Sequence, residues 1–222
     1  KEALTDAAVD KDDKEFIRTL RRMLAYWDDP NTRAWIIGDQ PRYGAPIIWN
    51  HINNDIVINK VFDETTGLSQ GDIVEEINGL AANTYLQREK HYVSGATDNW
   101  KTLRALAKIK SGEKDTELKL KIRKQSGDEQ EITLKRNKLL SEITQSRPAM
   151  IAQLDSSVCY VDLTGVSDQM IKDTVEYLKQ AKGIIFDARG QTSVSEHMLG
   201  LFIKSNLKSA TWLIPRYTKP DH

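Results

Sequence analysis

Apolar residues recur at helical spacing near the start of the chain. From Lys14 they return every three or four positions, which predicts an amphipathic helix with one buried stripe. That stripe consists of Phe16, Ile17, Leu20, Met23, Leu24 and Trp27. The charged stretch at 4–16 is expected to fray. Asp-Asp-Pro at 28–30 ends the helix, because proline disfavours helical backbone in the preceding residue. Residues 32–37 then predict an extended segment.

From about residue 42 to residue 136 the pattern changes to short strands and turns around one helix. Residues 45–61 predict two strands joined by Asn-Asn-Asp. Glycines and one Asn-Gly pair mark tight turns that need positive φ, namely Gly67, Gly71 and Asn78–Gly79. A helix is expected from about Asn99 to Lys110, capped near Gly112. The period-two runs at 116–124 and 130–136 predict paired strands, so the region is expected to form a small strand-rich barrel with one or two helices.

The last third has α/β patterning. A strand at 156–163, an amphipathic helix at 167–181 and an apolar, doubly buried strand at 183–188 form a βαβ unit, which implies a parallel sheet. A second helix at 195–206 and a strand at 210–217 are expected to follow. A parallel sheet that stops there would be short and would expose an edge. We therefore expect the chain to be a fragment or to lack a partner segment.

Composition narrows the function classes. The 222 residues contain 32 Lys plus Arg and 32 Asp plus Glu, so the formal net charge is zero. The chain therefore has no excess of positive charge that would indicate binding to nucleic acid or to an anionic membrane. No apolar run approaches the roughly 20 residues that span a bilayer. Cys159 is the only cysteine and is expected to be a small buried apolar residue on a strand. The four histidines lack metal-ligand spacing and no phosphate-binding glycine loop is present, so we predict no metal and no cofactor.

Four motifs, in order, resemble the tail-specific, carboxyl-terminal-processing serine proteases. GLSQGDIVEEING at 67–79 is similar to the signature of their PDZ domain, and the strands at 117–136 resemble its terminal pair. KGIIFDARGQTSVSE at 182–196 resembles their GLILDLRGNPGG stretch, and the tricorn core protease has a similar one. MLAYWDDPNTRAW at 23–35 resembles their early helix with DPHT or DGHT.

The resemblance implies a fold and an activity. The fold class is a multidomain α+β and α/β protein, with a helical segment at 1–41, a PDZ-like β-barrel at 42–137 and part of a ClpP/crotonase-like peptidase domain at 138–222. The implied activity is proteolysis with capture of a polypeptide tail. Family members use a serine nucleophile with a lysine base or a histidine–glutamate pair, and the nucleophile lies beyond the end of this chain. No cofactor is implied.

Two positions depart from the family pattern. Asn31 stands where the histidine branch has its base, and an amide cannot act as a general base; a structural turn with Asn31 in left-handed geometry is the alternative. Ser193 and Val194 replace the paired glycines whose backbone N–H stabilises the oxyanion. SVSE also fits a capping box with Ser193 as the N-cap and Glu196 reaching back, and an alignment shift of a residue or two is a third interpretation.

The PDZ resemblance implies that a peptide C-terminus adds as a strand. Residues near its carboxylate would be Tyr43, Gly44 and Ala45, and the side-chain pocket would be lined by Ile47, Leu103 and Leu106. The helix leucines could equally belong only to the core. Arg189 is expected to be a structural ion-pair partner, with a substrate carboxylate as the alternative, and His197 to be a surface residue.

Two function classes remain open. One is a serine peptidase, of which this chain carries the recognition domain and part of the catalytic domain. The other is an inactive relative that binds peptide tails or serves as a scaffold. The partner in both cases is a polypeptide, and the oligomeric state stays open. The chain begins at Lys1 without methionine, which fits a bacterial protein that is periplasmic, secreted or lipid-anchored after removal of a leader, although a shortened chain would look the same.

Overall fold

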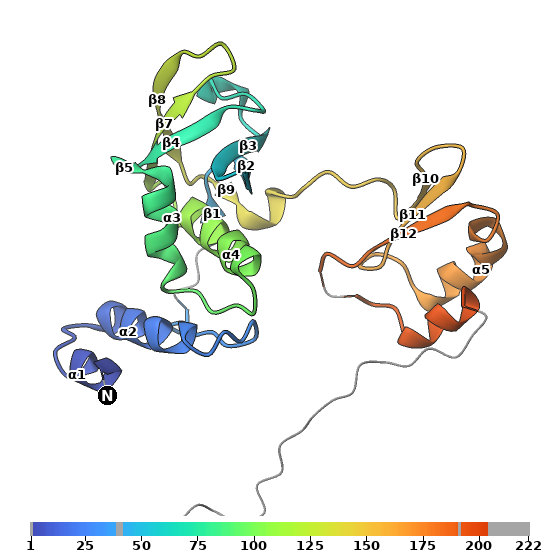
Figure 1. Ribbon diagram of the computed structural model, residues 1–222, viewed down its shortest axis with the longest axis horizontal. Coiled ribbons are helices and arrows are strands. Elements are labelled where there is room, and N and C mark those ends of the chain that lie inside the picture. Colours follow the sequence, from blue (N-terminus) through green and yellow to red (C-terminus); the bar gives the residue numbers. More distant parts are fainter. Residues whose placement is uncertain (1, 39–41, 191, 204–222) are drawn as a thin grey trace, which may run out of the picture. The chain divides into compact units, whose positions relative to one another are not determined.

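Two units make up the computed structural model, residues 1–145 and residues 146–222, and each is described by itself (Figure 1). The structure describes residues 2–38, 42–190 and 192–203. The strand expected at 210–217 and the end of the helix expected at 195–206 lie outside the described residues. The division of the chain into segments 1–41, 42–137 and 138–222 stays a prediction.

Unit 1 begins with two helices, α1 (Glu2–Ala7) and α2 (Asp13–Ala25). The Asp12 side chain caps α2 by accepting the N–H of Glu15 at 2.8 Å, which satisfies one of the free donors of the first turn. The expectation that residues 4–16 fray is wrong at 4–7 and 13–16, which are helical. The expectation of a buried stripe is also wrong in part, because Phe16 is 43% exposed and Trp27 66% exposed. Residues 32–36 form no strand.

The described strands of unit 1 form two sheets. The larger has the order β2-β3-β4-β7-β8, with β5 paired to β4. Its strands are β2 (Ile47–Ile52), β3 (Asp55–Val61), β4 (Ile73–Ile77), β5 (Leu80–Ala81), β7 (Glu117–Arg123) and β8 (Glu129–Lys135). The smaller has the order β6-β1-β9, formed by β6 (Ser111–Gly112), β1 (Tyr43–Gly44) and β9 (Lys138–Leu139). Both are antiparallel.

The hairpin turns confirm the turn signals of the sequence. Asn53 and Asn54 have φ of 50° and 70° between β2 and β3, and Asn78 and Gly79 have φ of 49° and 78° between β4 and β5. Positive φ at both central residues gives a turn whose twist matches paired strands, and asparagine and glycine adopt it at low cost. Short 3-10 turns complete the unit, η1 (Glu64–Thr66) and η2 (Leu140–Glu142).

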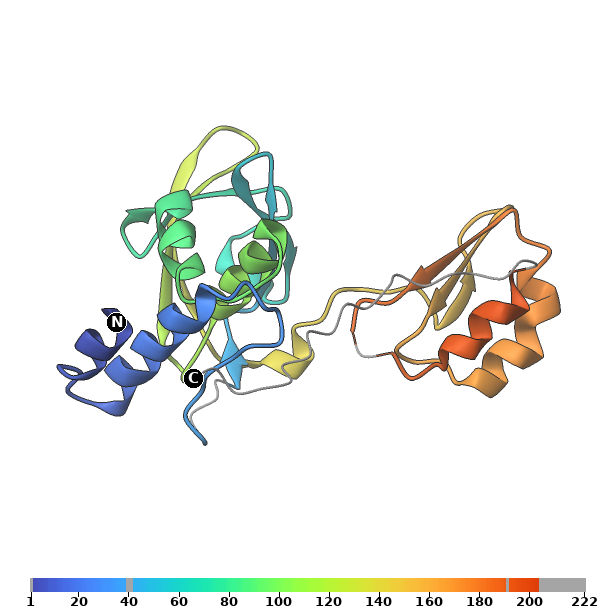
Figure 2. The same ribbon diagram turned by 60° about the horizontal axis from the view of Figure 1, so that its bottom comes forward.

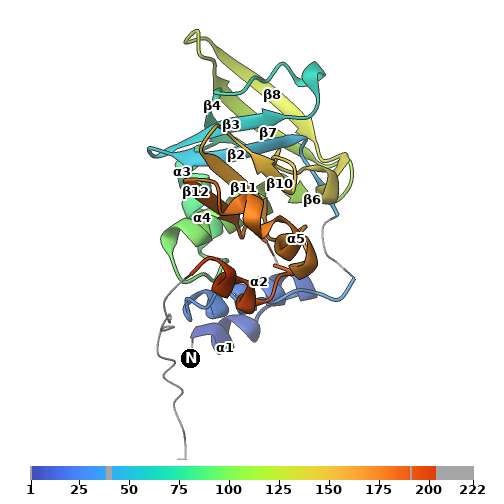
Figure 3. The ribbon, with the colours of Figure 1, turned by 90° about the vertical axis from the view of Figure 1, so that its right-hand side faces the viewer.

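Two helices cover one side of the larger sheet, α3 (Ala82–Lys90) and α4 (Asp98–Lys110), and they lie between the sheet and α2 (Figure 3). The sequence predicted α4 and missed α3. The core of the unit lies between these helices and the strands and includes Ile58, Ile77 and Leu120, all at most 2% exposed. The indole N–H of Trp49 donates to the carbonyl oxygen of Leu106 at 3.1 Å, which joins β2 to α4.

The described residues of unit 2 form a three-stranded sheet and one α-helix. Strand β11 (Val158–Asp162) pairs in parallel with β12 (Gly183–Asp187) and antiparallel with β10 (Ile151–Gln153). Helix α5 (Asp168–Leu178) connects β11 to β12, which confirms the βαβ unit, and the 3-10 helix η3 (Glu196–Leu201) lies beside α5 (Figure 2).

The core of unit 2 packs α5 and η3 against the parallel strands. Cys159 is buried in it at 3% exposure, as expected. The expectation that β12 is buried on both faces is wrong, because Ile185 is 48% exposed. An apolar strand therefore leaves one face uncovered within the described residues.

Candidate functional site

The turn at 28–32, where the resemblance places a catalytic histidine, is closed by its own side chains. The Asp29 carboxylate accepts the hydroxyl of Thr32 at 2.5 Å and the backbone N–H of Asn31 at 2.9 Å. These bonds hold the pKa of Asp29 below its ordinary value, and the bond from Thr32 has the larger effect. Asn31 is exposed. We expected left-handed backbone at Asn31, but Asp28 is the residue with positive φ, at 51°.

The candidate peptide-binding residues lie around the N-terminal end of β2. Tyr43 and Gly44 form the middle strand of the small sheet, between β6 and β9. The N–H of Ala45 donates to the carbonyl oxygen of Lys110 at 2.9 Å, and that of Ile47 to the carbonyl oxygen of Ala45 at 2.7 Å. The backbone donor of Ala45, at the expected carboxylate position, and that of Ile47, in the expected side-chain pocket, are therefore already used.

The side-chain pocket residues divide into two groups. Ala45 and Ile47 are fully buried and Leu106 is 2% exposed, so these three contribute to the core. Leu103 is 52% exposed on α4. Strand β2 ends its sheet, so its outer edge has no strand partner among the described residues. An extended peptide can add to such an edge. The assignment of these six residues to peptide binding stays a prediction.

In unit 2, a charged network sits where the parallel strands β11 and β12 end. The Asp187 carboxylate accepts Arg189 Nη2 at 2.6 Å and Nε at 2.9 Å, the Tyr160 hydroxyl at 2.6 Å and the Arg189 backbone N–H at 3.0 Å. The hydrogen bond from Arg189 is the main cause that lowers the pKa of Asp187, and the bond from Tyr160 adds to it. The same contact raises the pKa of Arg189. Arg189 is therefore an ion-pair partner, as expected.

A second ion pair extends this network. Arg147 Nη1 donates to both carboxylate oxygens of Asp162, at 2.8 and 2.9 Å, and to the hydroxyl of Thr164 at 3.0 Å. Arg147 Nη2 also donates to the carbonyl oxygen of Arg189. The hydrogen bond from the Thr164 hydroxyl is the main cause that lowers the pKa of Asp162, and the bond from Arg147 adds to it. Because Asp162 and Asp187 are register partners, the two ion pairs lie at one end of the sheet.

Sequence reasoning missed Arg147, Asp162 and Tyr160. The signal that could have found Asp162 is its place at the end of a parallel strand, the edge where open α/β sheets bind ligands. Arg147 lies in the segment before β10 and gave no pattern. The arrangement fixes the loops after β11 and β12 relative to each other, and all four charged groups are paired.

The candidate oxyanion residues lie on the loop after β12. The Ser193 N–H donates to the carbonyl oxygen of Leu163 at 3.1 Å. The Ser193 hydroxyl donates to the carbonyl oxygen of Val166 at 2.8 Å. Val194 is half-buried against the apolar core of unit 2. An oxyanion donor must point at the reacting oxygen, so the bond from Ser193 would have to open first. The assignment of both residues to an oxyanion site stays a prediction.

The capping-box expectation at this loop is corrected. The 3-10 helix η3 begins at Glu196, and the residue before it is Ser195, whose hydroxyl oxygen accepts the N–H of His197 at 3.3 Å. The Ser195 N–H donates to the Asp168 carboxylate at 2.9 Å. Ser193 does not cap the helix, because its hydroxyl is turned to the loop after β11. His197 is exposed.

A small apolar pocket of about 210 Å³ opens beside Val194. It is lined by Leu163, Ile171, Phe186, Thr192, Val194, Ser195, Met198 and Phe202. The rings of Phe186 and Phe202 meet edge to face with centroids 5.3 Å apart, which gives the pocket a rigid wall. The pocket has the size and apolar lining for one side chain of a bound peptide.

No cluster of His, Cys, Asp and Glu that could hold a metal ion occurs in the described residues. Within residues 2–38, 42–190 and 192–203, no helix has the length and apolar character needed to cross a bilayer.

Solved structures similar to this chain include those of CPAF, a tail-specific protease. Mature CPAF complexed with lactacystin superposes with a TM-score of 0.59 at 11% identity and covers 84% of this chain and 48% of that one. An alanine mutant of CPAF gives a TM-score of 0.51 at 14% identity over 60% of this chain and 26% of that one. The PDZ domain of the carboxy-terminal protease from Vibrio cholerae, solved in complex with peptide, superposes with a TM-score of 0.30 at 13% identity. This match covers 44% of this chain and 96% of that one.

No known family profile matches the sequence, and no curated protein does. At 11% identity the match to CPAF establishes a shared fold. The resemblance to tail-specific proteases, predicted from four short motifs, is confirmed at that level. The chain spans about half the length of the mature CPAF that it matches.

Proposed function

We propose that the chain carries the polypeptide-binding domain and the first part of the peptidase domain of a serine peptidase of the carboxyl-terminal-processing type. The observation that carries the proposal is the fold shared with mature CPAF over 84% of the chain. Such a match over both units is expected when the order of domains is the same as well as the folds. In this proposal the PDZ-like domain is residues 42–137 and the ClpP/crotonase-like domain begins at 138.

The tail of a substrate would add to the outer edge of β2 in this proposal. Main-chain pairing with the strand gives affinity, and side-chain contacts give specificity. Leu103, exposed on α4, would contact an apolar side chain of the tail, while Ala45, Ile47 and Leu106 support the strand and helix from the core. The Ala45 N–H would exchange the carbonyl oxygen of Lys110 for the terminal carboxylate.

A second candidate function is tail binding without cleavage. The bond from the Ser193 N–H to Leu163 favours it, because an occupied donor cannot stabilise an oxyanion. Asn31 also cannot serve as the base of the histidine branch. If the protein uses a lysine as its base, Asn31 does not affect catalysis. Either function places the protein outside the cytoplasm in our proposal, as a periplasmic, secreted or lipid-anchored protein, which cell fractionation tests.

Binding of a labelled peptide to the 222-residue chain tests tail capture. A peptide with an apolar C-terminal residue and a free carboxylate is compared by fluorescence anisotropy with the same peptide amidated at its C-terminus. We expect the free carboxylate to bind at least about tenfold more tightly, since about 1.4 kcal/mol corresponds to that factor.

The Leu103→Asp variant should weaken this binding, because it places a carboxylate beside the apolar side chain of the tail. Leu80→Asp is the matched control, since Leu80 is also a partly exposed leucine (40%) but lies on β5. Equal affinity for the acid and the amide, or equal loss in both variants, would rule out tail capture at this edge.

A further inference from the structure

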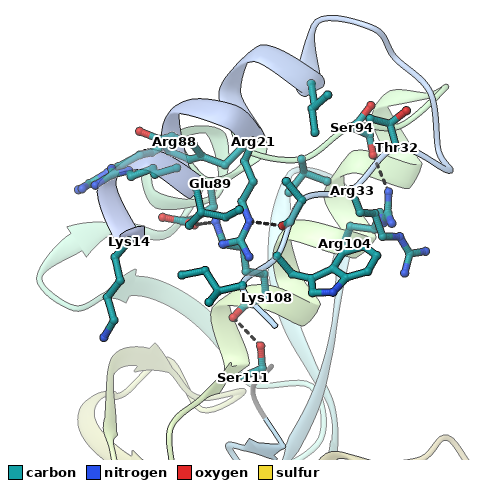
Figure 4. A pocket seen from close by; sticks show the side chains of 18 residues that line it. Lys14, Arg21, Thr32, Arg33, Arg88, Glu89, Ser94, Arg104, Lys108 and Ser111 are labelled. Carbon is teal, nitrogen blue, oxygen red and sulfur yellow. Dashed lines mark hydrogen bonds and ion pairs between the residues drawn. The ribbon is translucent and has the colours of Figure 1, made fainter. Parts of the chain in front are cut away.

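A pocket of about 870 Å³ lies within unit 1 between α2, residues 32–36 and the helices α3 and α4 (Figure 4). Its volume falls in the range, roughly 300–1,000 Å³, of pockets that hold small ligands. Two hydrogen bonds fasten its walls together. The Ser94 hydroxyl donates to the carbonyl oxygen of Asp29 at 2.8 Å, and Arg104 Nη1 donates to that of Pro30 at 3.0 Å.

The pocket is strongly basic although the chain as a whole is neutral. Among the described residues that line it, seven carry positive charge and one carries negative charge. The basic residues are Lys14, Arg18, Arg21, Arg33, Arg88, Arg104 and Lys108. The acidic residue, Glu89, forms an ion pair with Lys108 at 2.9 Å and so leaves the arginines uncompensated.

None of the five arginines of the pocket forms an ion pair with another described residue. Two are instead held by backbone oxygens, Arg21 by that of Ala34 at 2.9 Å and Arg104 by those of Pro30 and Ser94 at 3.0 and 2.8 Å. Burial lowers the pKa of Arg104, and the nearby charge of Arg33 adds to this shift. Like charges crowded at one place are stabilised by an anion placed between them.

The walls between these charges are apolar and aromatic. They are formed by Ile17, Leu24, Ala34, Trp35, Ile36, Tyr92 and Val93. Arg18 Cζ lies over the Tyr92 ring at 4.6 Å from the ring centroid, and Lys108 Nζ lies at 5.1 Å from it. These cation–π contacts hold two cations beside the ring. Trp35 is 51% exposed. A ligand that fits must therefore carry several negative charges and apolar groups together.

We propose that this pocket binds an acidic segment of an extended polypeptide. Asp and Glu side chains of the segment pair with the guanidinium groups, which suit carboxylates because they can donate two parallel hydrogen bonds. Apolar side chains of the segment pack on Trp35 and Ile17. A nucleic acid fits less well, because its backbone demands a basic track across a domain and this chain has zero net charge. The inference stands apart from tail capture and cleavage, since it requires neither.

The test uses the 222-residue chain and a labelled peptide of Asp, Glu and Leu, amidated at its C-terminus so that tail capture does not contribute. Fluorescence anisotropy gives the affinity at low and at raised NaCl. The variant Arg33→Glu with Arg88→Glu reverses two exposed charges of the pocket. The control, Lys119→Glu with Lys172→Glu, makes the same change of net charge at two exposed lysines elsewhere. Circular dichroism checks the folding of both.

We expect the acidic peptide to bind the wild-type chain and to bind it more weakly at raised NaCl. Its affinity for the pocket variant should be at least about tenfold lower, while its affinity for the control variant should be unchanged. Equal affinities in the two variants would overturn the proposal, as would a Lys-rich peptide that binds as well as the acidic one. A single-stranded oligonucleotide that binds more tightly, and loses affinity in the same variant, would overturn the choice of a polypeptide as the occupant.

Discussion

The two units of this chain hold themselves together in different ways. In unit 1, nineteen buried apolar residues form one cluster between the larger sheet and the helices α3 and α4. In the described part of unit 2 the corresponding cluster has six, and ion pairs join the loops at the end of its parallel strands. Because buried apolar area is the main source of stability, unit 1 is expected to be the more stable unit and unit 2 the more sensitive to pH.

The difference fits the roles that we propose. In our proposal unit 1 keeps its shape through its core, and a ligand would meet the edge of β2 and the exposed face of α4. Unit 2 instead places charged and polar groups where open α/β sheets bind ligands. Its loop after β12 is held by hydrogen bonds to the loop after β11. Rearrangement of these bonds is what an active oxyanion site would require.

The largest expected effect is a break in the core of unit 1. Ile77→Ala removes a fully buried side chain and should cost about 2–5 kcal/mol, since the cavity it leaves cannot close completely. Urea unfolding of the whole chain, followed by tryptophan fluorescence, should show an earlier transition for unit 1 alone. Ile52→Ala, at a half-exposed position of β2, is the control. A shift of equal size in both variants would contradict the comparison.

A smaller effect, confined to unit 2, is expected from Asp187→Asn. The folded state holds the pKa of Asp187 below its ordinary value of 3.8. Its ionised form therefore stabilises the fold fully above that value, and this stability is lost as the pH falls from 3.8 towards the lower pKa of the folded state. The wild-type chain should lose stability in unit 2 below about pH 4, and the asparagine variant should show a weaker dependence on pH there. Acid titration by circular dichroism measures both, and identical acid profiles would refute the role of this carboxylate.

The smallest effect comes from matched helix caps. The Thr97 side chain accepts the N–H of Trp100 at 3.2 Å in α4, and that of Ser167 accepts the N–H of Met170 at 3.3 Å in α5. Each substitution by alanine should cost about 1 kcal/mol. Thr97→Ala should move only the unfolding of unit 1 and Ser167→Ala only that of unit 2. If either variant moves both transitions, the units do not unfold separately.

Local signals in the sequence predicted much of this fold. The pairs Asn53–Asn54 and Asn78–Gly79 determine their turns from their own backbone preferences, and the βαβ unit followed from length and apolar pattern. Helix α3 was missed because only Ala82, Leu86 and Lys90 are buried in it, too few to give a clear period. The stripe on α2 was predicted, but a stripe does not say whether another element covers it.

The sites were harder to predict than the fold. The pair of Arg147 and Asp162 spans fifteen positions, and the basic pocket gathers residues from α2, α3 and α4. Such contacts depend on how elements pack, which no local pattern records. The motifs pointed to proteins that share this fold, yet the bond of Ser193 to Leu163 could be found only in the structure.

A proteolysis assay on the longest natural protein that contains this chain tests the account most directly. An unfolded protein is the substrate, with and without a covalent inhibitor directed at serine, and tail-peptide binding is measured in parallel. The account predicts cleavage that the inhibitor abolishes. Tail binding without any cleavage would contradict it and would favour a relative kept for peptide binding alone.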